Sequence, residues 1–336
     1  MSDVIDLNGG ALDGAALESG KTYRNGRMRY VTAHKTEGVT LDGIRLLTGE
    51  KHGLHAIGAK ALTLVNCAID SEDVPKSGTH GVFFQSGTGL TVQGLKVKRA
   101  RLGVTARFAA DVEIVDGDFT GISEDAIRFI SCTNAATRRC QFHDFAGENI
   151  GGEGLHPDSI QVFTYDGIPN AGIAIEDNLC FVGKGSKYQG PFIRAYDDQP
   201  APTGLVVRRN VVLCQMGNGI VVAGDGELVD NFVAGYEGLD TSKISLNMAT
   251  WRGKVSGNKA QHWLNSAVGY KKGWAPDGNE YVEAVTEEQA AQIVADWRAR
   301  FRPEPIILPE GLSPAVLAFL DERYNPATGS RVTVRR

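Results

Sequence analysis

Two aspartates that precede neighbouring apolar segments are the strongest candidates for chemistry in this sequence. Asp125 is followed by Ala-Ile-Arg-Phe-Ile, and Asp158 is followed by Ser-Ile-Gln-Val-Phe. If these segments are adjacent strands, their backbones lie about 4.8 Å apart, and the two carboxyls cannot both ionise freely. Such a pair supplies a general acid together with a base or nucleophile, and its oxygens would also suit Ca²⁺. The structural alternative is a pair of aspartates that only cap turns.

Two further polar residues stand beside this pair. Glu124 is adjacent to Asp125, and His156 precedes Asp158 by two residues on the longest loop. We therefore expect the catalytic group to consist of Asp125, Asp158, Glu124 and His156. In a lyase acting on a uronate, a side chain of this region would remove a proton, and an arginine or a cation would neutralise the sugar carboxylate.

The segments that follow the long loops have the alternation of strands with one buried face. Their second and fourth residues are apolar, so their third and fifth residues are expected to face outward. One outward column then holds Arg128, Gln161 and Arg194. Arginines and aromatic rings on an outward face can hydrogen-bond to sugars and stack on them. The expected binding residues are Arg107, Arg128, Gln161, Phe163, Tyr165, Arg194, Tyr196, Asp197 and Asp198.

These segments belong to an internal repeat with a period of about 22 residues, extended in places by insertions. Each unit has a short apolar strand, a corner residue, a second strand, a variable loop and a third strand. The corner positions are Gly43, Asn66, Gly94, Gly117, Arg139, Asn178, Asn210, Asn231 and Asn258. Asparagine and glycine tolerate the left-handed backbone of a sharp corner, and stacked asparagines can hydrogen-bond from one coil to the next. The period predicts a solenoid of parallel β coils.

This pattern resembles the right-handed parallel β-helix of the pectate-lyase-like superfamily, over roughly residues 20 to 265. The resemblance implies an all-β fold whose substrate groove follows the third strand of each coil and the loops before it. That superfamily contains polysaccharide lyases, glycoside hydrolases and phage tailspike depolymerases, so fold alone does not determine activity. Residues 123–127 are similar to the Gly-Asp-Asp-Cys-Ile stretch of polygalacturonases, and residues 156–160 to their Asn-Thr-Asp stretch. The order is reversed here, and only a carboxylate cluster carries over, onto Glu124, Asp125 and Asp158.

The last part of the chain has a different pattern. Thr286 and Gln289 form a capping box before a helix expected over residues 286–301, and a second helix is expected from Ser313. We therefore divide the chain into an N-terminal cap (1–20), a parallel β-helix (21–265) and a short, mostly helical C-terminal extension (266–336) that packs on the solenoid.

Composition excludes several function classes. The formal net charge of −5 argues against nonspecific nucleic-acid binding. The sequence has no run of 18 apolar residues, so no membrane insertion is expected. The five cysteines include no CxxC pair and are expected to be small buried hydrophobes. Residues 1–6 do not have the pattern of a signal peptide, so the chain is expected to be cytoplasmic as synthesised.

The function that these features favour is cleavage of an acidic, bacterial-surface polysaccharide by a lyase or a glycoside hydrolase. The expected partner is a polysaccharide, and the expected cofactor is none, or Ca²⁺ if the enzyme is a lyase. The alternative is a noncatalytic glycan-binding spike or adhesin of a phage or phage-like particle. By analogy with phage depolymerases, such a protein would be a homotrimer, associated with the virion and active outside the cell.

Overall fold

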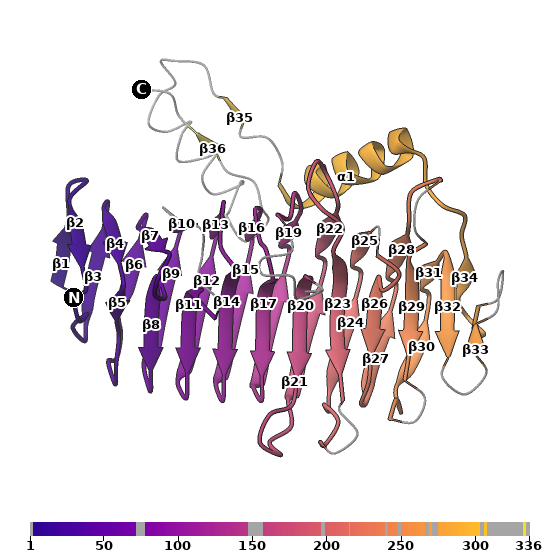
Figure 1. The fold of residues 1–336 in the computed structure, drawn as a ribbon, viewed down its shortest axis with the longest axis horizontal. Helices are drawn as coiled ribbons and strands as arrows, with labels where there is room; N and C mark the ends of the chain where they lie inside the picture. The colour runs from indigo at the N-terminus through magenta and orange to yellow at the C-terminus, as the bar shows by residue number, and fades with distance from the viewer. Residues whose placement is uncertain are drawn as a thin grey trace, which may run out of the picture. The chain divides into compact units, whose positions relative to one another are not determined.

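The computed structural model of the chain describes residues 3–71, 78–146, 157–195, 199–214, 216–238, 241–247, 250–265, 269–270, 275–302, 306–307 and 332–333. The chain divides into two compact units, Met1–Ala284 and Val285–Arg336. The described strands of the first unit form three long sheets that lie side by side along its length (Figure 1). All strand pairs of these sheets are parallel except β32 with β33.

We call the three sheets A, B and C. Sheet A consists of β1 (Asp3–Asp6), β3 (Lys21–Arg24), β6 (Thr40–Asp42), β9 (Lys60–Val65), β12 (Thr88–Gln93), β15 (Ala110–Val115), β18 (Thr133–Arg138), β21 (Ala171–Glu176), β24 (Leu205–Arg208), β27 (Gly226–Val229) and β30 (Lys254–Ser256). Sheet B consists of β2 (Ala11–Asp13), β4 (Arg27–Arg29), β7 (Arg45–Thr48), β10 (Ala68–Ser71), β13 (Lys96–Val97), β16 (Asp118–Phe119), β19 (Gln141–Phe142), β22 (Leu179–Phe181), β25 (Val211–Leu213), β28 (Phe232–Ala234), β31 (Lys259–Ala260) and β34 (Glu280–Tyr281). Sheet C consists of β5 (Val31–Thr32), β8 (Leu54–Ile57), β11 (His80–Gln85), β14 (Leu102–Arg107), β17 (Asp125–Ile130), β20 (Asp158–Phe163), β23 (Gln189–Arg194), β26 (Ile220–Val222), β29 (Lys243–Leu246), β32 (His262–Asn265) and β33 (Gly269–Tyr270).

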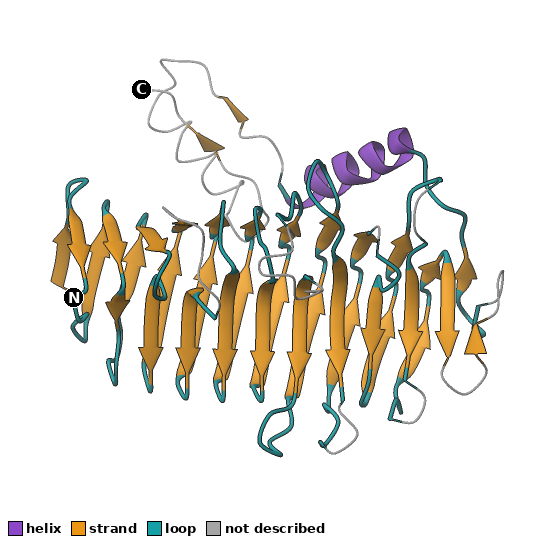
Figure 2. Cartoon of the chain, in the orientation of Figure 1, coloured by secondary structure: helices purple, strands orange, loops and turns teal. Residues whose placement is uncertain are grey.

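The chain visits the three sheets in turn, so each circuit through A, B and C is one coil of a solenoid (Figure 2). Each strand pairs in parallel with the equivalent strand one coil away, as Leu90 of β12 pairs with Leu62 of β9 and Val112 of β15. The predicted parallel β solenoid with three strands per coil is therefore confirmed.

The strands extend beyond the boundaries expected from the sequence. The segment expected to be an N-terminal cap contains β1 and β2, which pair with β3 and β4. At the other end, β34 pairs with β31, so coil structure continues past residue 265.

Alternating apolar side chains fill the inside of the solenoid. In sheet C, Ile127 and Phe129 of β17 and Ile160 and Val162 of β20 are fully buried, as their second and fourth positions predict. All five cysteines are free and buried, as expected for small hydrophobic residues of a core. Burial of the apolar side chain at each such position stabilises the coils by roughly 1.5–3 kcal/mol.

Asparagines form a buried ladder at the corner between sheets A and B. Asn178 Nδ2 donates to Asn210 Oδ1 at 3.0 Å, and the amides of Asn210 and Asn231 continue the ladder to Asn258 at 2.9 and 2.8 Å. The predicted coil-to-coil hydrogen bonds are therefore confirmed. The left-handed residue is not the ladder asparagine but the residue before it: Asp177, with a φ of 55°, precedes Asn178. The asparagine faces inward, and its side chain satisfies backbone groups of the corner.

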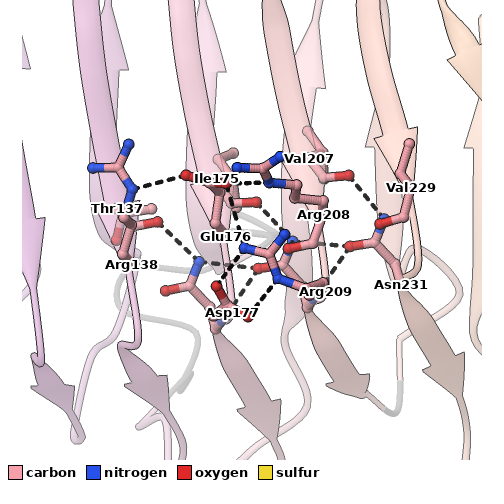
Figure 3. Close-up of polar contacts among 12 residues, drawn as sticks. Thr137, Arg138, Ile175, Glu176, Asp177, Val207, Arg208, Arg209, Val229 and Asn231 are labelled. Carbon is pink, nitrogen blue, oxygen red and sulfur yellow. Dashed lines mark hydrogen bonds and ion pairs between the residues drawn. The ribbon is translucent and has the colours of Figure 1, made fainter. Parts of the chain in front are cut away.

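Charged side chains cover the outside of this corner (Figure 3). Glu176 of β21 accepts from Arg138 Nε at 2.8 Å and from Arg208 Nε on the other side. Arg209 pairs with Asp177 at 2.7 Å. Each carboxylate is thus bound by an arginine of a neighbouring coil, and these ion pairs help to fix the register of sheet A.

The ladder makes a testable prediction about stability. Replacing Asn210 by alanine should lower the free energy of unfolding by about 1–3 kcal/mol, because the main-chain N–H and the side-chain amide of Asn178 both lose their acceptor. The measurement is chemical denaturation followed by circular dichroism. Gln93→Ala is the control, since this amide at the end of β12 is exposed and should matter by less than about 0.5 kcal/mol. Equal midpoints for the two variants would contradict the structural role of the ladder.

In the second unit, α1 (Glu287–Phe301) has the predicted capping box, with Gln289 N donating to Thr286 Oγ1 at 3.1 Å. Ala290, Val294 and Trp297 are buried along one face of this helix. Strands β35 (Ile306–Ile307) and β36 (Val332–Thr333) pair in parallel. The second expected helix lies outside the described residues, and packing of this unit on the solenoid stays a prediction. No described helix has the length and apolar character needed to span a membrane.

Candidate active site

The two aspartates singled out in the sequence begin adjacent strands of sheet C. Asp125 is the first residue of β17 and Asp158 the first residue of β20, and the two are register partners. The Asp158 main-chain N–H donates to Asp125 Oδ1 at 2.9 Å. The side chains are 1% and 2% exposed. The predicted placement of the two aspartates side by side on adjacent coils is therefore confirmed, whereas their chemical role stays a prediction.

Asp125 is neutralised by a chain of alternating charges. Arg128, which faces outward from the same strand, donates through Nε to Asp125 Oδ2 and through Nη2 to Glu124 Oε1, both at 2.5 Å. Arg101 donates to the other oxygen of Glu124 at 2.6 Å. Burial opposes ionisation of Glu124, but Arg128 and Arg101 hold its pKa below the usual range. Two arginines thus balance the charges of two carboxylates.

Among the described residues, no cation forms an ion pair with Asp158. Gln161 Nε2 donates to Asp158 Oδ2 at 3.1 Å, and Asp158 Oδ1 is buried without a hydrogen-bond partner among the described residues. Burial raises the pKa of Asp158 well above its usual value, and the charge of Asp125 adds to this effect. Burial also raises the pKa of Asp125, against the opposing charge of Arg128. Asp158 is therefore the member of the pair that keeps a proton to the higher pH.

Histidines that sequence reasoning did not select lie two coils away in the same outward face. His80 begins β11, its Nδ1 lies 2.7 Å from Thr105 Oγ1, and its main-chain N–H donates to His52 Nδ1 at 3.2 Å. The ring of Phe83 stacks on His80 and His55, with centroids 4.6 and 5.3 Å away. Burial lowers the pKa of His80 to about 3, with His52 and Arg128 contributing. These imidazoles are therefore neutral. The feature of the sequence that could have pointed to this cluster is the recurrence of histidine at or near the start of successive sheet C strands.

A second cluster lies at the other end of the sheet C strands. Arg107 is the last residue of β14, and its guanidinium carbon lies 4.2 Å from the ring centroid of Tyr165 and 4.9 Å from that of Phe108. Tyr165 is 46% exposed. Arg107 and Tyr165, both expected to be binding residues, thus lie in contact with each other, and they stand apart from the carboxyl pair along the strand.

The position expected for Arg194 is wrong by two residues. The register pairs Gln161 with Phe192 and Phe163 with Arg194, so Arg194 belongs to the column of Arg107 and not to that of Arg128. A shift of two residues preserves the inward and outward alternation, so the pattern alone cannot reveal it. In the same register, Gln189 is the partner of Asp158 on the next coil. His156, Tyr196, Asp197 and Asp198 lie outside the described residues.

The carboxyl cluster fits calcium poorly. Ca²⁺ needs six to eight oxygen ligands, but the Arg128 guanidinium already contacts oxygens of both Asp125 and Glu124. Across the residues that the structure describes, no three His, Cys, Asp or Glu side chains are grouped so that they could hold a metal ion. We therefore assign no step of the reaction to a metal ion.

Comparisons with known proteins agree with this architecture. The model of the family described as "Right handed beta helix region" matches residues 30–235. Among solved structures, the surface adhesin PfbA of Streptococcus pneumoniae has a TM-score of 0.57 at 11% identity, over 81% of this chain and 78% of that chain. The Dettilon tailspike protein has a TM-score of 0.56 at 10% identity, over 85% of this chain and 60% of that chain.

An alginate lyase from Paenibacillus sp. str. FPU-7 matches with a TM-score of 0.48 at 14% identity, over 82% of this chain and 97% of that chain. The search of curated proteins found no match. At these identities the solved structures show the fold alone, and the chain spans less than two thirds of the tailspike. The family match covers more than half of the chain and agrees with the three parallel sheets. The protein therefore belongs to the right-handed β-helix family.

Proposed function

We propose that this protein hydrolyses a polysaccharide at the carboxyl pair Asp125–Asp158. The observation that carries the proposal is a second carboxyl, Asp158, buried beside a carboxyl that already has its arginine. An uncompensated buried carboxyl destabilises a fold, so packing does not account for its presence. Pairs of titratable groups with strongly shifted pKa values cluster at functional sites.

The roles follow from the contacts of each carboxyl. Asp158, whose pKa is raised well above its usual value, is the proton donor to the glycosidic oxygen. Asp125 is the charged member, which Arg128 and the Asp158 N–H hold in place. It serves as the base that activates water or as the nucleophile, the two functions of the second carboxylate in glycoside hydrolases. Glu124 and Arg101 are positioning residues, because they reach Asp125 only through Arg128.

The surrounding face suits an extended polymer. The partly exposed Arg128 and Gln161 are the parts of the cluster that reach the surface, and the outward face of sheet C runs the length of the solenoid on both sides of them. Hydrolysis is favoured over elimination, because a buried carboxyl that keeps its proton is an acid and not the base that a lyase requires. Bacterial capsule and exopolysaccharide preparations are the proposed substrate class.

The test is incubation of the purified protein with a panel of bacterial surface polysaccharides, followed by measurement of reducing ends. We expect new reducing ends from at least one polysaccharide, no rise in the ultraviolet absorbance of unsaturated uronates, and no loss of activity with a chelator. Unsaturated products or inhibition by the chelator would contradict the hydrolase assignment and favour a lyase. Tight binding of a glycan that stays intact would instead favour a binding spike or adhesin.

A further inference from the structure

Arg107 carries a positive charge that no carboxylate of the described residues neutralises. Its guanidinium contacts the rings of Tyr165 and Phe108, but it has no hydrogen bond or ion pair to any described residue, and its Nε is buried without a partner. Arg101 and Arg128 on the same face are both bound to carboxylates. A guanidinium has five N–H donors in a planar fork that matches carboxylate, sulfate and phosphate groups. The terminal Nη groups of Arg107 are thus available for an anion, whereas its buried Nε is not.

Tyr165 is exposed on a loop that the fold holds firmly. Ser131 Oγ accepts from the Tyr165 main-chain N–H at 2.9 Å and donates to its carbonyl at 3.0 Å. Asn170 donates to the carbonyl of Phe163 at 2.9 Å and accepts from Cys132 N at 2.8 Å, which closes the base of the loop. A ring that is 46% exposed on so well anchored a loop is not needed to fill the core. The Tyr165 ring and the Arg107 guanidinium that contacts it together form one surface patch.

We infer that Arg107 and Tyr165 form a binding subsite for a sugar unit that carries an anionic group. The sugar ring lies against Tyr165, and its carboxylate, sulfate or phosphate accepts hydrogen bonds from Arg107. The two aromatic rings that contact the guanidinium keep it in place without consuming its hydrogen bonds. This inference rests on the proposed function and adds to it that the polysaccharide is acidic.

The subsite is remote from the reacting bond. Arg107 pairs with Ile130, which stands five residues after Asp125 on β17, so the two ends of the strand are about 16 Å apart at ~3.3 Å per residue. A contact so far from the reacting bond binds the substrate and the transition state equally strongly. Its loss should therefore raise KM and leave kcat nearly unchanged.

The experiment is isothermal titration calorimetry with polygalacturonate, alginate, hyaluronate and dextran sulfate, with neutral dextran as the comparison. The wild type should bind at least one acidic polymer and bind dextran much more weakly. Arg107→Gln and Tyr165→Ala should each weaken that binding about 10- to 100-fold, the usual effect of losing hydrogen bonds to a charged group. Tyr165→Phe, which keeps the aromatic ring, should weaken that binding less than Tyr165→Ala does. The preferred polymer tells a carboxylate site from a sulfate site.

Arg27→Gln is the matched control, because it removes the same charge from an exposed arginine on sheet B. Binding to none of the acidic polymers, equal binding of dextran, full binding by Arg107→Gln, or an equal loss in Arg27→Gln would each overturn the subsite. The variant Asp158→Asn distinguishes failure of the binding subsite from failure of the proposed hydrolase activity. If Asp158→Asn and the wild type both bind through Arg107 but neither cleaves, the subsite stands and only the hydrolase proposal fails.

Discussion

Replacing Asp158 by asparagine is expected to lower the rate of polysaccharide hydrolysis by ~10²–10⁴, the usual contribution of a positioned general acid. Asparagine keeps the hydrogen bond with Gln161 possible but has no acidic proton to transfer. Asp125→Asn should cause a loss of similar size, because the charged partner disappears. The measurement is the initial rate of reducing-end formation at saturating substrate, with binding measured in parallel.

The pH dependence of the wild type gives the same prediction a second form. A general acid must be protonated, and burial raises the pKa of Asp158 well above the usual range. The rate should therefore rise with pH as Asp125 loses its proton, and fall only when pH passes the pKa of Asp158, which lies well above the usual aspartate value of about 3.9. Asp116→Asn is the control, since that carboxylate pairs with Arg139 away from sheet C. Full activity in both Asp125→Asn and Asp158→Asn would contradict the assignment and leave the two aspartates as turn caps.

The second large effect concerns stability. Replacing Arg128 by methionine should lower the free energy of unfolding by about 3–5 kcal/mol, because Asp125 would remain buried without its cation. The pKa of Asp125 is already raised by burial in the folded protein, so protonation relieves the penalty. The stability difference from the wild type should therefore shrink as pH falls and grow as pH rises through that pKa. Chemical denaturation at several pH values measures this difference.

Arg138→Met supplies the comparison for that experiment. Arg138 also pairs with two carboxylates, Glu113 and Glu176, but its side chain is 33% exposed, and partly exposed pairs typically contribute about 0–1 kcal/mol. Combining Arg128→Met with Asp125→Asn should recover much of the lost stability, since the unpaired charge is gone. A loss in Arg128→Met no larger than that in Arg138→Met would show that the buried charge chain does not hold Asp125.

Much of the fold could be predicted from the sequence because the physical signals are local and repeated. Alternation with a period of two identifies the buried face of β17 and β20, and inward residues such as Ile127 and Ile160 must be apolar. The same alternation places Asp125 and Asp158 at equivalent positions, so their stacking could also be predicted. The asparagine ladder was visible because Asn178, Asn210 and Asn231 recur at the same corner.

Other features depend on geometry that residue types do not encode. Alternation is unchanged by a shift of two residues, so the register of Arg194 needed the coordinates. Arg128 looked available for a substrate anion, but its outward position places it within reach of Asp125 and Glu124. Arg107 has the same residue type and faces the same way, yet its guanidinium lies against the rings of Tyr165 and Phe108 and not against a carboxylate of the described residues. Which arginine binds a carboxylate of the protein is decided by packing across coils.

The proposal that Asp125 and Asp158 hydrolyse a polysaccharide is tested most directly by product mass after reaction in water enriched in heavy oxygen. Hydrolysis transfers the solvent oxygen to the new end of the chain. We predict one heavy oxygen atom in each fragment with a new reducing end from the wild type, and a yield of such fragments lower by ~10²–10⁴ from Asp158→Asn after the same reaction time. Unlabelled, unsaturated fragments, or an equal yield of labelled fragments from Asp158→Asn, would contradict the account.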